Sequence, residues 1–60
     1  MNELLKFAED GNADQVYAIL ESGRGDEALD KIRRGYENGY LEDEDFCKLV
    51  FHILNIRNFQ

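Results

Sequence analysis

The chain has 60 residues, which allows a single small domain with one modest core. It carries 13 acidic and seven basic residues, and its net charge of −6 opposes contact with phosphate backbones and anionic membrane surfaces. It has no apolar run of about 18 residues that could span a membrane, and its first residues lack the pattern of a secretion signal. Its single cysteine cannot form a disulfide within the chain. We therefore expect a cytoplasmic protein that binds neither nucleic acid nor membranes directly.

The spacing of apolar residues predicts an all-α fold. Apolar side chains recur every three or four residues rather than every second one, and glycines rather than prolines separate the periodic stretches. We predict one helical domain over residues 1–60, a compact bundle in which the last helix is central. The predicted helices cover about residues 2–10, 13–22, 27–38 and 42–57.

Capping residues mark the first two predicted helices. Asn2 is placed to cap the first helix, and Gly11 can take the left-handed conformation that ends it. Asn12 is placed to cap the second helix, with Gln15 three residues later, and Gly23 closes it. The two helices are therefore expected to be joined by a tight turn.

The segment AEDGNADQVYAILESG, residues 8–23, resembles the helix pair of an ankyrin repeat. Gly11 matches the turn between the helices, and Val16, Ile19 and Leu20 match the packing positions. The resemblance implies a local antiparallel helix pair. The residues before it depart from the family's opening motif, and no second copy follows at the repeat spacing, so it does not extend to a repeat array.

The third predicted helix carries the only concentrated positive charge, at Lys31, Arg33 and Arg34. Its cap is expected to be Asp26, and Gly39 is expected to end it. Acidic residues stand three and four positions from these basic side chains, a spacing that favours ion pairs within the helix. We therefore expect no DNA site on this helix.

The acidic run at the start of the last helix has two interpretations. Carboxylates in the first turn are stabilised by the helix dipole, which gives the run a structural role. The run also allows an alternative function, in which the protein mimics nucleic acid as phage-encoded inhibitors of restriction or CRISPR defence do. The predicted acidic patch consists of Glu37, Glu42, Asp43, Glu44 and Asp45.

The sequence contains no complete set of catalytic or metal-binding residues. A calcium loop around ENGYLEDEDF would place Arg34 and Tyr36 where the ion needs carboxylates. Cys47 and His52 point about 140° apart on one helix, so they cannot share a metal ion. We predict no catalytic residue, no metal site and no cofactor.

The last helix has more apolar surface than a small bundle needs to cover. Its apolar residues fill an arc of about 220°, whereas a surface helix needs little more than about 100°. If the other helices cover the side with Phe46, Leu49 and Ile53, the opposite side stays exposed. We predict that this side binds another protein, or a second copy in a homodimer, and that the chain is a noncatalytic regulator, inhibitor or adaptor. The predicted interface residues are Cys47, Val50, Phe51 and Leu54.

Overall fold

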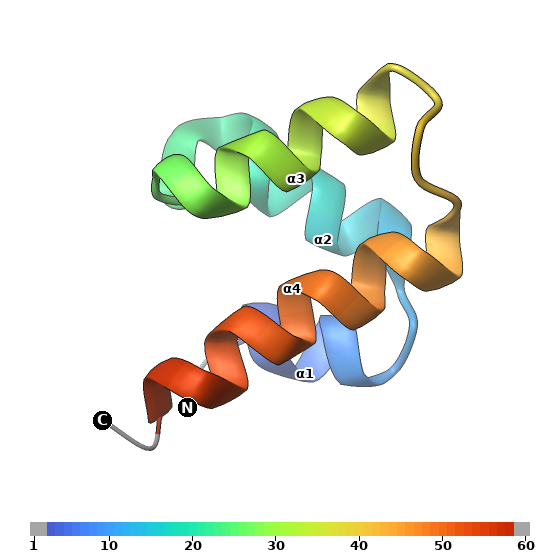
Figure 1. Ribbon diagram of the computed structural model, residues 1–60. Coiled ribbons are helices and arrows are strands. Elements are labelled where there is room, and N and C mark those ends of the chain that lie inside the picture. Colours follow the sequence, from blue (N-terminus) through green and yellow to red (C-terminus); the bar gives the residue numbers. More distant parts are fainter. Residues whose placement is uncertain (1–2, 59–60) are drawn as a thin grey trace.

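The chain is described over residues 3–58 in the computed structural model, and this part contains helices and no strand (Figure 1). The predicted all-α fold is therefore confirmed. The elements in chain order are α1 (Glu3–Glu9), α2 (Ala13–Ile19), the π-helical turn η1 (Leu20–Arg24), α3 (Glu27–Glu37) and α4 (Asp43–Asn58).

Side-chain caps and left-handed glycines bound the helices where the sequence predicts them. The Asn12 side chain accepts a hydrogen bond from the Gln15 N–H at 3.4 Å, and Asp26 accepts one from the Leu29 N–H at 3.1 Å. Three glycines have a positive φ, which L side chains rarely adopt. One follows α1, one lies inside η1 and one follows α3. They are Gly11 at 73°, Gly23 at 84° and Gly39 at 84°. The predicted cap Asn2 lies outside the described residues.

The second helix differs from its predicted extent of residues 13–22. Its α-helical part ends at Ile19, and Leu20–Arg24 continue as a wider π-helical turn. Gly23 lies inside that turn and has a left-handed backbone conformation, with φ 84° and ψ 14°. The prediction was wrong only in the type of helix formed by the last turn. The left-handed Gly23 lies where the sequence predicts it.

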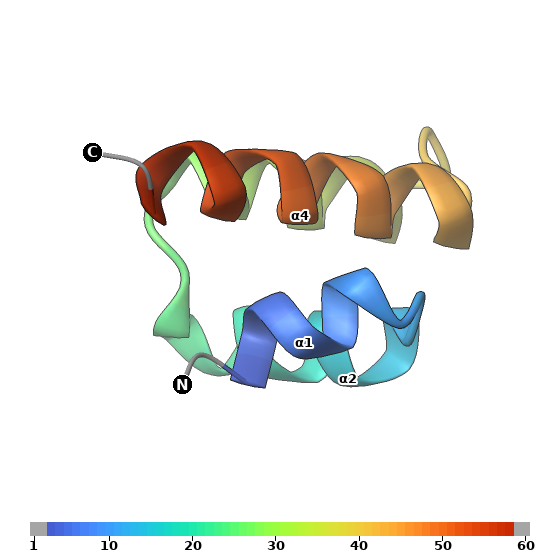
Figure 2. The same cartoon turned by 90° about the horizontal axis from the view of Figure 1, so that it is seen from below.

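The helices lie in two layers (Figure 2). One layer contains α1 and α2, which run in opposite directions and pack against each other, as the ankyrin-like segment implies. The other layer contains α3 and α4, which lie over the first pair. α4 packs against each of the other three α-helices, so it is the central helix of the bundle.

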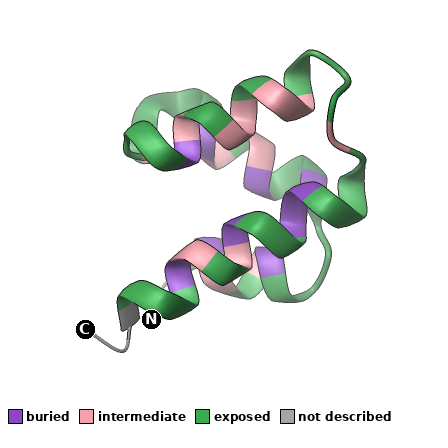
Figure 3. Ribbon diagram, viewed as in Figure 1, coloured by how far each residue is buried: buried purple, intermediate pink, exposed green. Residues whose placement is uncertain are grey.

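The core lies between the two layers, and every helix contributes to it (Figure 3). Phe46, Val16 and Val50 have the largest side chains that are fully buried. Burial of each side chain of this size stabilises the fold by roughly 1.5–3 kcal/mol. The buried residues are Leu4, Ala8, Ala13, Val16, Leu20, Leu29, Phe46, Cys47, Val50 and Leu54.

Candidate functional site

The structure corrects the predicted position of the exposed apolar surface. Of the four predicted interface residues, Cys47, Val50 and Leu54 are buried within the single chain, and Phe51 is half-buried against the core. The expectation of exposure is therefore wrong for Cys47, Val50 and Leu54, and Phe51 is only partly exposed. Their side of α4 faces α1 and α2, which cover it.

The exposed apolar residues lie on the opposite flank of α4. Leu49 is 40% exposed and Ile56 is 45% exposed, and Ile53 between them is half-buried. These positions are three and four residues apart, so their side chains are neighbours on one face of the helix. This flank is the one that we expected the other helices to cover.

α3 lies beside this flank but does not close over it. An open depression of about 670 Å³ separates the first half of α3 from α4, lined by Ala28 and Ile32 on one side and Ile53 on the other. Ala28 is exposed and Ile32 is half-buried. An open depression of this kind does not enclose a small ligand, because ligand pockets bury about 70–90% of a drug-sized molecule. Together these side chains form what we call the apolar strip: Ala28, Ile32, Leu49, Ile53 and Ile56.

Charged side chains border the apolar strip. Asp26, Glu27 and Lys31 line the depression on the α3 side. Arg57, near the end of α4, forms an ion pair with Asp26. The hydrogen bond from the Leu29 N–H lowers the pKa of Asp26, and the Arg57 guanidinium lowers it further. The α3 and α4 sides of the depression are therefore joined at this end by a salt bridge.

The predicted acidic patch is partly occupied by contacts within the chain. The Tyr17 hydroxyl and Arg33 both donate to Glu37, at 2.6 and 2.9 Å. The Tyr36 hydroxyl donates to Asp43 at 2.6 Å, and Lys48 pairs with Glu44 at 2.9 Å.

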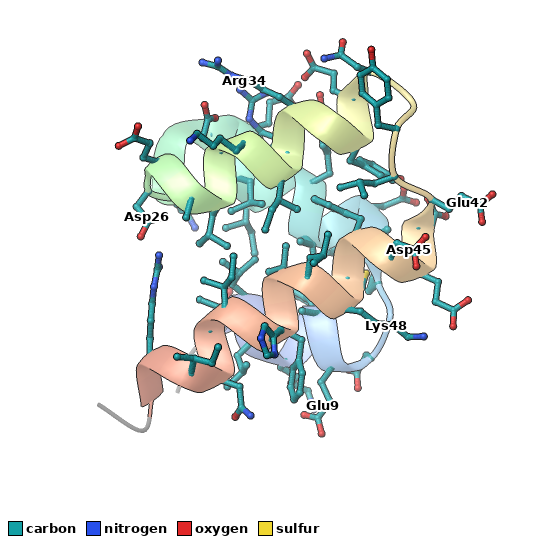
Figure 4. The ribbon with its side chains drawn as sticks, viewed as in Figure 1. Glu9, Asp26, Arg34, Glu42, Asp45 and Lys48 are labelled. Atoms are coloured by element: carbon teal, nitrogen blue, oxygen red, sulfur yellow. The ribbon has the colours of Figure 1, made fainter. Side chains whose placement is uncertain are left out.

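The other two patch residues, Glu42 and Asp45, are exposed at the start of α4, at the opposite end of the molecule from Asp26 (Figure 4). Asp43, Glu44 and Asp45 fill the first turn of that helix, where the helix dipole favours negative charge.

The carboxylates of Glu37 and Asp43 raise the pKa of the two tyrosines that donate hydrogen bonds to them. The hydrogen bond to Glu37 raises the pKa of Tyr17 to about 12, and the hydrogen bond to Asp43 raises the pKa of Tyr36 to about 12. The Tyr36 ring also stacks on Phe46, with ring centroids 4.2 Å apart. These hydrogen bonds join α2 to α3 and α3 to α4, so part of the acidic patch serves to hold the helices together.

Two of the three basic residues of α3, Arg33 and Arg34, pair within the helix as predicted. Arg33 contacts Asp30 and Glu37 at 2.8 and 2.9 Å, and Arg34 contacts Asp30 at 3.0 Å. No ion pair involves Lys31 among the described residues.

Cys47 and His52 lie in different environments. Burial raises the pKa of the Cys47 thiol, which lowers its reactivity. His52 is exposed on the outer face of α4. Within residues 3–58, no group of three or more His, Cys, Asp or Glu side chains is placed to hold a metal ion.

Comparison with protein-family models, curated proteins and solved structures finds no match to this chain. In the described part of the chain, no helix combines the length and apolar character needed to cross a membrane.

Proposed function

We propose that this chain is a noncatalytic protein-binding module of the cytoplasm, a regulator, inhibitor or adaptor, which binds its partner through the apolar strip. The observation that carries the proposal is the exposure of Leu49 and Ile56 on a helix whose other apolar residues are buried or half-buried. An exposed apolar stretch bordered by charged residues is typical of a protein interaction site. The cytoplasm is a reducing compartment, and the placement there is supported by the one cysteine, which is a buried free thiol.

A second copy of the chain is one candidate partner. A two-fold axis would let the same strip serve both copies. Such a homodimer would have to use Leu49, Ile53 and Ile56, because Cys47, Val50 and Leu54 already pack inside one chain.

The alternative function, mimicry of nucleic acid by the acidic patch, has weaker support. Cations pair with two of the five patch carboxylates, Glu37 with Arg33 and Glu44 with Lys48. Such pairing reduces the negative potential that a nucleic-acid-binding surface would meet. Glu42 and Asp45 are the patch residues on which a decoy would chiefly depend.

Affinity capture from the native host's lysate, with matched variants as bait, tests the proposal. Ile56→Glu places a charge in the apolar strip, and Asn55→Glu adds the same charge at the neighbouring position, about 100° around the helix. We expect Ile56→Glu to lose the captured protein and Asn55→Glu to retain it. A third bait, Asp45→Lys, separates the two functions: loss of capture with this variant alone would support the decoy and contradict binding through the strip.

A further inference from the structure

The depression between α3 and α4 is a candidate binding groove for another helix. Its walls are the apolar edges of two helices, Ala28 and Ile32 on α3 and Ile53 on α4. Along α4 the apolar edge continues from Leu49 to Ile56, a length of about 10 Å or two helical turns. An amphipathic helix laid in such a groove contacts it through apolar anchors at positions i, i+3, i+4 and i+7.

The exposed apolar area is small for a stable homodimer. Specific stable complexes bury about 800 Å² per partner, and obligate dimers bury more with a more apolar core. The whole accessible surface of the chain is 4272 Å², and the large apolar side chains exposed on α4 are only Leu49 and Ile56, each less than half exposed. A short helix that fills the depression suits this apolar area better than a second copy of the chain does.

Charge also favours a foreign partner over a second copy. Each chain has a net charge of −6, so two copies repel each other, whereas a cationic partner is attracted. At the two ends of the apolar strip stand acidic side chains without an ion pair in the described structure: Glu27 beside Ala28, and Asp45 four residues before Leu49. Two basic residues lie near the strip. Lys31 lines the depression and has no ion pair among the described residues, and Arg57 forms an ion pair with Asp26.

We propose that the occupant of the depression is a basic amphipathic helix, with about two turns of apolar anchors and Lys or Arg residues at both ends of its apolar stretch. This inference rests on the proposed function and specifies its partner. The apolar anchors contact Ile32, Ile53 and Ile56, and the basic ends lie near Glu27 and Asp45. Such a segment belongs to another protein, since four of this chain's seven basic residues form ion pairs within it.

Two synthetic peptides test the inference directly. Both have about four turns and the same leucines at positions i, i+3, i+4 and i+7. One carries lysines beside the leucines, and the other carries glutamates at the same positions. We expect binding of the lysine peptide, measured by fluorescence anisotropy, to be at least about tenfold tighter than that of the glutamate peptide.

Variants of the chain distinguish binding in the groove from non-specific attraction between opposite charges. Ile56→Glu makes the chain more negative, so non-specific attraction to the lysine peptide rises. Loss of the apolar anchor should nevertheless weaken binding about tenfold. Asn55→Glu adds the same charge outside the strip and should leave binding within about twofold. Circular dichroism of both variants confirms that they are folded.

Each other outcome overturns the inference in a distinguishable way. If both peptides bind equally and Ile56→Glu weakens both, the strip binds helices without regard to charge, and the proposed function stands. If neither peptide binds and sedimentation equilibrium shows a dimer that Ile56→Glu dissociates, the occupant is a second copy, and the proposed function again stands. If the lysine peptide binds Ile56→Glu as tightly as the parent chain, the strip is not the binding surface and both proposals fail. If neither peptide binds and the chain is a monomer, a basic helix is not the partner, and the lysate capture alone decides the proposed function.

Discussion

Arg57, in the last turn of α4, forms an ion pair with Asp26, the residue that caps α3. The two residues are far apart in the sequence, and their contact joins the end of one helix to the beginning of another. Asp26 has two roles in this arrangement, since its side chain also accepts the hydrogen bond from the Leu29 N–H. Asp26 also lines the depression together with Ile32 and Ile53, so the contact lies at its edge.

The two roles of Asp26 can be separated by substitution. Asp26→Asn keeps a side-chain oxygen for the cap and removes the charge, whereas Asp26→Ala removes both. We expect Asp26→Asn and Arg57→Gln to lower the melting temperature only slightly, because the ion pair is solvent-exposed. Asp26→Ala should lower it clearly more. Equal effects of Asp26→Asn and Asp26→Ala in thermal unfolding followed by circular dichroism would show that the cap contributes little.

Leu54 should contribute to the stability of a single chain rather than to association. Leu54 is buried within the chain, so Leu54→Ala is expected to reduce the free energy of unfolding by about 2–5 kcal/mol. This is a large part of the roughly 3–9 kcal/mol expected for a chain of this size. Leu49→Ala, at an exposed position on the same helix, should cost about 1 kcal/mol or less.

Urea unfolding at two protein concentrations checks the effect of Leu54→Ala. We expect its loss of stability to be the same at both concentrations, because the contacts are within one chain. A loss that grows with protein concentration would instead place Leu54 in an interface between copies.

Gly25 is required for close packing at the start of α3. A Cβ atom at this position would lie 2.8 Å from Leu20 Cδ2 and 3.1 Å from Leu29 Cβ, and both leucines are core residues. Gly25→Ala is therefore expected to destabilise the chain by about 1–3 kcal/mol through overpacking. The exposed neighbour provides a control, since Arg24→Ala should change stability by no more than about 0.5 kcal/mol. Unchanged urea midpoints for Gly25→Ala would show that the two leucines can move apart without loss.

The tyrosine–carboxylate hydrogen bonds predict a loss of stability at alkaline pH. The pKa of Tyr36 is raised from its ordinary value of 10.0 to about 12 in the folded chain, chiefly by the hydrogen bond to Asp43. A group whose pKa is higher in the folded state stabilises fully below its unfolded pKa, and this contribution is lost as the pH rises towards the folded pKa. We therefore expect stability to fall between about pH 10 and about pH 12.

The variant Tyr36→Phe isolates this contribution. It should lower stability at neutral pH and make the alkaline loss smaller than in the parent chain. Tyr40→Phe is the control, because Tyr40 is 84% exposed and makes no hydrogen bond among those described for the side chains. Urea midpoints measured from about pH 8 to about pH 11 provide the comparison, and an alkaline loss of the same size in Tyr36→Phe would contradict the assignment.

The local features of this fold were determined by the sequence itself. Asn12 and Asp26 cap their helices, and Gly11, Gly23 and Gly39 take the left-handed conformation, because capping and left-handed geometry depend on the few residues around each helix end. The absence of strands from residues 3–58 follows in the same way from the helical spacing of the apolar side chains.

Only the tertiary structure decided which flank of α4 is exposed. The apolar arc of α4 is wide, and both of its flanks carry Leu, Ile or Phe, so helical periodicity gives no sign of which flank the other helices cover. That choice depends on how the connecting segments direct α1 and α2 beneath Cys47 and Leu54 while α3 leaves Leu49 and Ile56 partly open. The contacts of Tyr17 with Glu37 and of Asp26 with Arg57 could not be predicted from the sequence for the same reason. Side chains that far apart in the chain meet only through the packing of whole helices.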